Sequence, residues 1–160
     1  MRIFTTAALL IATAMLLAST LPASASWKVS QSSAIIENDG NSALSLVCDN
    51  NANTNFKPGW LVRIDALDLN RVGPRVRVDF RFAGYRIFSM MADNRQGHIS
   101  IDSMNQATQS DILTLVSRLK AASRVTVTVI DDANGHAMEP LAFGLTGSSR
   151  AISQIAQACR

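Results

Sequence analysis

The chain holds few residues of the types that carry out catalysis. It has two histidines, His98 and His136, and a serine nucleophile would need one of them beside both a serine and a carboxylate. Serines are plentiful, yet none lies in the Gly-x-Ser-x-Gly turn that exposes a hydrolase nucleophile. We find no phosphate-binding glycine loop either. The sequence therefore predicts a protein that is not an enzyme and that carries no cofactor.

One pair of residues has the chemistry of a soft-metal site. His136 and Met138 stand two positions apart in residues 136–145, a segment predicted to form a strand, so both side chains would project from one face. An imidazole and a thioether together suit copper(I). Methionine more often fills a hydrophobic core, however, and a single His-x-Met pair does not make a cluster. We therefore predict no resident metal, and we keep a copper or small-ligand carrier as the alternative function.

Four arginines provide a second candidate for binding, and they are Arg71, Arg75, Arg77 and Arg81. Guanidinium groups fork onto carboxylates and phosphates, and arginine is enriched at protein interfaces. The four predict a docking surface for an acidic protein, for anionic lipid head groups or for cell-wall material. The other interpretation is a solvated sheet face, on which Arg63 and Asp65 of a neighbouring strand pair with Asp79 and with these arginines.

The first 25 residues have the pattern of an export signal. Arg2 supplies the positive start, residues 7–17 are almost unbroken apolar sequence, and Ala23-Ser24-Ala25 offers the small residues of a cleavage site. Cleavage would leave one globular domain, residues 26–160, with a net charge of about +2, which is too mild to predict nucleic-acid binding. No later apolar run is long enough to span a membrane. We therefore predict a periplasmic or secreted protein without a stable membrane anchor.

Both cysteines, Cys48 and Cys159, follow the predicted leader. An exported chain meets an oxidising compartment, and these two residues allow only one intramolecular disulfide. In the loop-entropy model a bridge that closes most of the domain contributes roughly 4–5 kcal/mol to the free energy of unfolding. Two free thiols or an intermolecular bridge are the alternatives that the sequence leaves open.

Hydrophobic periodicity then predicts the elements that position these residues. Residues 75–82 give the clearest strand, because four apolar residues alternate strictly with four charged ones. Further strands are predicted at residues 27–37, 42–48, 60–67, 85–91, 98–103, 125–130 and 136–145.

The period changes in two segments that predict helices. Thr108 has the chemistry of a helix N-cap, and apolar residues recur at helical spacing after it. In residues 149–158 the same spacing places Ile152, Ile155 and the following Cys159 on one face. The chain therefore predicts an α+β fold. An antiparallel sheet or small sandwich would carry one or two helices, stapled by the Cys48–Cys159 disulfide.

The arrangement resembles a known family. The exported start, Trp27-Lys28-Val29 at the opening of the domain, the lone Cys48 closing an early strand, and the ending Phe143-x-Leu145-x-Gly147-Ser148-Ser149-x-Ala151-Ile152-x-x-Ile155-x-x-x-Cys159 together resemble VasI-like periplasmic proteins associated with bacterial type VI secretion. The resemblance implies a non-enzymatic accessory role in the cell envelope, and no catalytic residues come with it.

These observations lead to one expected function and two alternatives. We expect an exported accessory or binding protein that contacts another envelope or secreted protein, as secretion-system accessories, immunity proteins and inhibitors do. The first alternative is the periplasmic carrier of copper or a small ligand. The second is a hydrolase whose site is scattered along the chain. The sequence leaves the oligomeric state open.

Overall fold

The computed structural model describes residues 26–49, 59–95, 97–102 and 106–158 of the chain. The predicted leader, residues 1–25, lies outside the described residues, and so does Cys159. In the described part, no helix has the length and apolar character needed to cross a membrane.

The described strands form a single antiparallel sheet in the order β1-β2-β3-β4-β7-β6-β5-β8-β9. The strands are β1 (Lys28–Val29), β2 (Ser33–Glu37), β3 (Ala43–Asp49), β4 (Gly59–Asp65), β5 (Arg75–Phe82), β6 (Phe88–Asn94), β7 (His98–Asp102), β8 (Arg124–Asp131) and β9 (Leu141–Gly144). Hydrogen-bonded ladders of this kind position the outward side chains at alternate residues.

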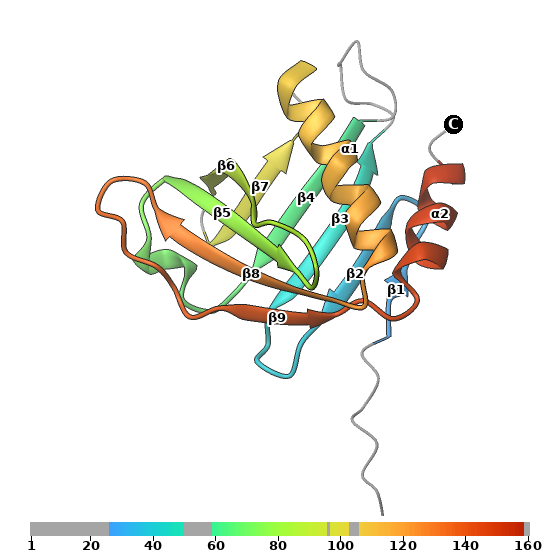
Figure 1. Cartoon of the computed structure of the whole chain (residues 1–160), viewed down its shortest axis with the longest axis horizontal. Coiled ribbons are helices and arrows are strands. Elements are labelled where there is room, and N and C mark those ends of the chain that lie inside the picture. The colour runs from blue at the N-terminus through green and yellow to red at the C-terminus, as the bar shows by residue number, and fades with distance from the viewer. Residues whose placement is uncertain (1–25, 50–58, 96, 103–105, 159–160) are drawn as a thin grey trace, which may run out of the picture.

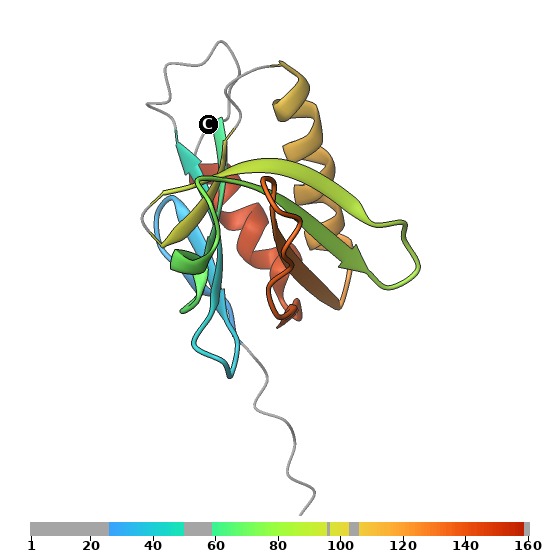
Figure 2. The same ribbon diagram turned by 90° about the vertical axis from the view of Figure 1, so that its left-hand side faces the viewer.

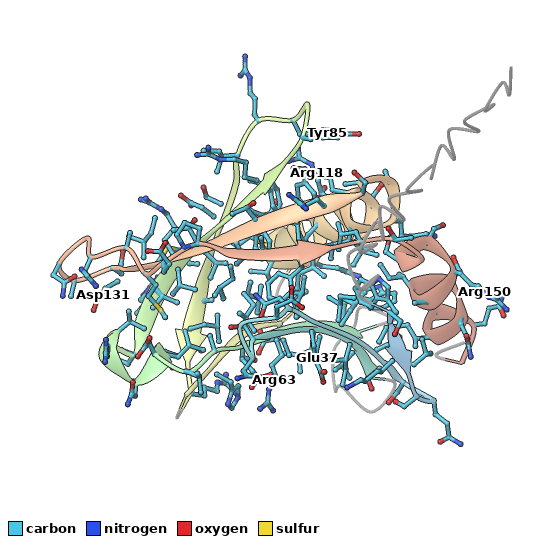
Figure 3. The ribbon with its side chains drawn as sticks, turned by 90° about the horizontal axis from the view of Figure 1, so that it is seen from below. Glu37, Arg63, Tyr85, Arg118, Asp131 and Arg150 are labelled. Carbon is cyan, nitrogen blue, oxygen red and sulfur yellow. The ribbon has the colours of Figure 1, made fainter. Side chains whose placement is uncertain are left out.

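The sheet curls into two layers that enclose one hydrophobic core. Strands β1 to β4 with β7 form one layer, and β5, β6, β8 and β9 form the other. Seen from below, β8 and β9 lie above β2 and β3, with side chains filling the space between them (Figure 3). The layers are joined where β6 meets β7, and the register there holds only two pairs, Asp93 with Ser100 and Asn94 with Ile99. The sheet therefore bends at a narrow seam.

Strand β5 shows why this sequence adopts such a sheet. Val76, Val78 and Phe80 are fully buried, whereas the charged residues between them face outward. Because successive side chains of a strand point to opposite sides, the alternating sequence can bury all of its apolar residues only in this register.

Two helices close the open side of the curled sheet (Figure 1). Helix α1 (Gln106–Ala121) packs against β4, β7 and α2, and it buries Ile112, Leu115 and Leu119. Helix α2 (Ser148–Ala158) packs against β1, β2 and β3. A short 3-10 helix, η1 (Leu69–Arg71), precedes β5. The prediction of an α+β fold with an antiparallel sheet and two packed helices is confirmed.

Several predicted boundaries were wrong, for local reasons. Residues 27–37 form two strands, because the Ser30 N–H donates to the Ser33 carbonyl oxygen at 2.8 Å and closes a tight turn between them. The predicted strand 136–145 is reduced to β9 and an isolated bridge at Ala137, since Pro140 lacks an N–H to donate to a ladder. Helix α1 begins at Gln106, so Thr108 lies inside the helix and is not its cap.

Candidate functional site

The arginine face has less free charge than the sequence indicates. Arg75, Arg77 and Arg81 point outward from β5, but Arg71 belongs to η1 and not to that strand. Three of the four lie close to a carboxylate: Arg71 to Asp68 at 3.2 Å, Arg75 to Asp132 at 3.9 Å and Arg77 to Asp79 at 3.2 Å. Exposed pairs of this kind contribute about 0–1 kcal/mol each to stability. The paired carboxylates also compete for the guanidinium groups that an acidic partner would have to contact.

The predicted ladder from β4 to the arginines was wrong. Strands β4 and β5 are not neighbours, because β7 and β6 lie between them. Arg63 instead donates to Asp65 on its own strand, with Nη2 at 2.7 Å and Nε at 2.9 Å from Oδ1. This hydrogen bonding raises the pKa of Arg63.

A pocket of about 400 Å³ brings three of the predicted residues together. Arg71, His136 and Met138 line it, with Asp68 and Glu139. His136 and Met138 lie outside the named strands, and they flank Ala137, which forms an isolated antiparallel bridge with Ile130 of β8. The β8–β9 connection carries both residues to the pocket. Among the described residues, no three of His, Cys, Asp and Glu gather as a metal-binding group.

Asp131 fixes the connection that carries His136. Its buried carboxylate accepts the Gly73 N–H through Oδ2 at 2.8 Å and the Ala133 N–H through Oδ1 at 2.8 Å. These donors, Gly73 first, lower the pKa of Asp131, because they stabilise the charged form. Asp131 therefore ties the start of β5 to the turn after β8, and its role is structural.

The sequence analysis did not predict an exposed apolar surface at the end of β5 that leads into β6. Tyr85 is 51% exposed and Ile87 is 49% exposed in the loop between β5 and β6, and Leu113 is 46% exposed on α1. A groove of about 510 Å³ runs between this loop and the helix, lined by Tyr85, Leu113 and Arg118. Figure 2 shows the β5–β6 hairpin reaching out from the body of the protein beside α1. We call Tyr85, Arg86, Ile87, Leu113 and Arg118 the hairpin–α1 surface.

Arg118 holds the hairpin–α1 surface in shape. Its guanidinium carbon lies 5.5 Å from the ring centroid of Tyr85 and 4.9 Å from that of Phe88, and Nη1 donates to the Arg86 carbonyl oxygen at 3.3 Å. Figure 3 shows the Tyr85 and Arg118 side chains next to each other, far from Asp131. The Tyr85 ring also meets Phe82 edge to face, with centroids 6.5 Å apart. Cation–π and edge-to-face contacts of this kind fix the loop before any partner arrives.

The electrostatics of the hairpin–α1 surface are positive. Among the described residues, no carboxylate lies within ion-pair distance of Arg86, Arg118 or the nearby Arg81. Asp111 is the only acidic residue in the sequence of α1. The hairpin–α1 surface therefore combines exposed apolar side chains with arginines that no described carboxylate pairs with.

Sequence reasoning missed this surface because it read residues 85–91 as one strand. In the structure β6 begins only at Phe88, and Tyr85 to Ile87 form the loop before it. The local signal was Gly84, whose φ of +80° opens a turn after β5. The contact with Leu113 and Arg118 has no local signal, since those residues belong to a helix more than twenty positions later.

Comparisons with protein-family models, with curated proteins and with solved structures found no match to this chain.

Proposed function

We propose that this chain is an exported, non-enzymatic binding protein of the bacterial cell envelope that acts through protein–protein contact. The hairpin–α1 surface carries the proposal. It combines an exposed tyrosine, two exposed aliphatic residues and two arginines, and Tyr85, Leu113 and Arg118 among them line a groove. Tyrosine and arginine are enriched among the residues that dominate the binding energy of protein interfaces. Exposed apolar side chains that gather around a groove commonly mark an interaction site.

The residue patterns of the sequence support the location and the class of this function. The leader pattern supports a periplasmic or secreted protein. The resemblance to VasI-like proteins supports an accessory role, with secretion systems, immunity and inhibition as the settings in which such a module acts. The partner would be another envelope or secreted protein. The paired state of Arg71, Arg75 and Arg77 favours the hairpin–α1 surface over the arginine face as the contact region.

The disulfide between Cys48 and Cys159 belongs to the same proposal. Cys48 is 1% exposed on the inward face of β3, and α2, the helix that Cys159 follows, packs against β3. A bridge would tie the end of the chain to the sheet and hold α2 in place. An exported module that waits in the envelope for its partner benefits from such a constraint.

A photo-crosslinking amino acid placed in the chain tests the contact region inside cells. We expect the photoreactive residue at position 113 or 87 to give a discrete adduct with one envelope protein, and the adduct to disappear when Tyr85→Glu is added. The matched control is position 67, because Leu67 is also a large exposed apolar residue, 75% exposed, but lies in the loop before η1. Equal adducts at all three positions, or adducts at position 67 alone, would contradict the proposed contact region.

The carrier is the second candidate function, and the pocket of about 400 Å³ favours it. Arg71 lines this pocket together with His136 and Met138, which come from a distant part of the sequence. Pockets of this volume hold small ligands, and an imidazole with a thioether suits copper(I). The pocket therefore offers a specific place to look for a bound metal or ligand.

A copper(I) titration against a competing chelator tests this candidate. The carrier predicts stoichiometric binding that is lost in the double variant His136→Ala with Met138→Ala. The matched control is His98→Ala with Met91→Ala, which removes the same two side-chain types from another part of the sheet. Weak binding that all three proteins share would exclude a copper site in this pocket.

A further inference from the structure

The seam between β6 and β7 leaves part of a strand edge without a neighbour. Strand β6 pairs with β5 along six residues, from Phe88 to Asp93, but with β7 only at Asp93 and Asn94. Beyond that point the two strands diverge. In the described part of the chain, no strand pairs with the β7-facing edge of β6 from Phe88 to Ala92.

The ladder shows which backbone groups this edge presents. The Asn94 N–H donates to the Pro74 carbonyl oxygen at 2.8 Å, so Asn94 points toward β5. The backbone N–H and C=O groups of successive residues in an antiparallel strand face opposite edges. The backbone groups of Ala92, Met90 and Phe88 therefore also face β5. The N–H and C=O groups of Met91 and Ser89 consequently face the opposite side. The Arg95 N–H, which donates to the His98 carbonyl oxygen at 2.8 Å, shows that the odd-numbered residues face β7.

A cavity lies where the two strands diverge. Its volume is about 320 Å³. Met91 and Asp102 line it from the two strands, and Arg75 of β5 and Thr108 of α1 complete its wall. The cavity gives an incoming chain space beside β6 at one end of the free edge. The groove between Tyr85, Leu113 and Arg118 gives space near the other end.

We propose that the free edge of β6 accepts an extended segment of the partner protein as an added strand. The segment hydrogen-bonds to the backbone of Ser89 and Met91 and reaches the hairpin–α1 surface. This recognition mode uses the exposed N–H and C=O groups of an edge for affinity and the side-chain pockets for specificity. The inference rests on the proposed function, because it names how the protein partner is bound.

The charges around the edge indicate the composition of the segment. Arg86 and Arg118 lie at the hairpin end and pair with no carboxylate among the described residues. At the seam end, Asp93 and Asp102 lie 3.3 Å and 3.8 Å from the Arg95 guanidinium, which neutralises them in part. The segment therefore carries acidic residues at the end beside Arg86 and an apolar residue for the groove.

A peptide selection tests this binding mode and does not require the partner protein to be identified first. The oxidised mature chain, residues 26–160, selects binders from a random peptide library displayed on phage. One selected peptide is synthesised with a single backbone N-methyl group at each position in turn. We expect methylation to weaken binding about tenfold at every second position of the core and to have little effect at the positions between, because alternate N–H groups face the edge. A selection that yields no peptide, or a scan without this alternation, overturns the proposal.

Two variants at one residue test the edge from the protein side. Met91→Pro removes an N–H that faces away from β5, so the β5–β6 ladder keeps its hydrogen bonds. We expect it to weaken the peptide about tenfold, whereas Met91→Ala, which keeps the backbone donor, changes the affinity less than about threefold. Circular dichroism checks that each variant is folded. If Met91→Pro does not fold, the N-methyl scan of the peptide by itself tests whether the segment binds as an added strand.

The remaining variants separate this inference from the proposed function. Arg86→Glu weakens a peptide with an acidic end, and the exposed Arg150→Glu on α2 serves as its control. Binding that Leu113→Glu abolishes but a folded Met91→Pro leaves intact overturns strand addition and keeps the protein-binding surface. Analytical ultracentrifugation tests whether the edge binds a second copy of this chain instead. If the protein is a dimer and Met91→Pro dissociates it, the edge is a dimer interface and the proposed partner segment is overturned.

Discussion

The Asp131 carboxylate accepts the backbone N–H of Gly73 at 2.8 Å, across 58 positions of sequence. The Cβ of any larger residue at position 73 would lie 3.3 Å from the Asp131 Oδ2, so glycine permits the close approach of this loop. Asn94 completes the arrangement, because its Nδ2 donates to the carbonyl oxygens of Leu69 and Val72 at 2.8 and 3.0 Å. Two side chains thus hold η1 and the start of β5 in place.

Asp131→Asn should lower the urea midpoint of unfolding at pH 7. The amide oxygen of asparagine can accept one of the two N–H groups, but its NH₂ group would face the other donor. The folded-state pKa of Asp131 lies below its ordinary value, so its stabilisation is full above the unfolded-state pKa and is lost as the pH falls through the folded-state pKa. The difference between wild type and variant should therefore shrink in acid. Asp132→Asn, at an exposed neighbour, is the control, and a pH-independent difference would contradict the assignment.

Phe80→Ala should lower the free energy of unfolding by about 3–5 kcal/mol. Phe80 is fully buried between β6 and β8, so removing its ring leaves a cavity that packed neighbours cannot fill. Leu67→Ala removes a large apolar side chain that is already exposed and should change stability by at most about 0.5 kcal/mol. Urea unfolding of both variants measures the contrast, and equal effects would be inconsistent with this core.

Arg118 and Tyr85 should show coupling in a double-mutant cycle. A cation placed over an aromatic ring at an exposed site contributes about 0.5–1 kcal/mol. Arg118→Met, Tyr85→Leu and the double variant, compared by thermal unfolding, give the coupling energy. The control cycle pairs Arg124→Met with Tyr85→Leu, because among the described residues it is Arg118, and not Arg124, that lies over the Tyr85 ring. A coupling energy near zero would show that the contact between Arg118 and Tyr85 does not stabilise the hairpin.

Reduction should destabilise the mature chain strongly. The loop-entropy model assigns roughly 4–5 kcal/mol to the Cys48–Cys159 bridge, so a reducing agent should lower the melting temperature. The double variant Cys48→Ala with Cys159→Ala should melt low with or without reductant. Mass spectrometry after alkylation of the unreduced protein measures the free thiols. Two alkylated cysteines in the exported protein, or a disulfide-linked dimer, would contradict the intramolecular Cys48–Cys159 disulfide.

Periodicity along the chain was enough to predict the class of fold and the buried faces of its main elements. The alternation of apolar and charged residues in β5 is readable in sequence because a strand repeats every two residues. The helical spacing of Ile152 and Ile155 predicted α2 in the same way. Such signals are local, since they depend only on which side of one element meets the core. Residues such as Ser30 and Pro140 altered the boundaries through backbone hydrogen bonding, which periodicity does not report.

The candidate site depends on how the elements pack together in three dimensions. The order of the strands separates β4 from β5, so Arg63 and Asp65 pair with each other and not with the arginine face. The approach of α1 to the β5–β6 hairpin places Arg118 over Tyr85, and the divergence of β6 from β7 leaves an edge without a neighbouring strand in the described part of the chain. These relationships arise from the packing of elements that are distant in the chain. No spacing within the sequence encodes them, because chain separation does not fix which faces meet across a curled sheet.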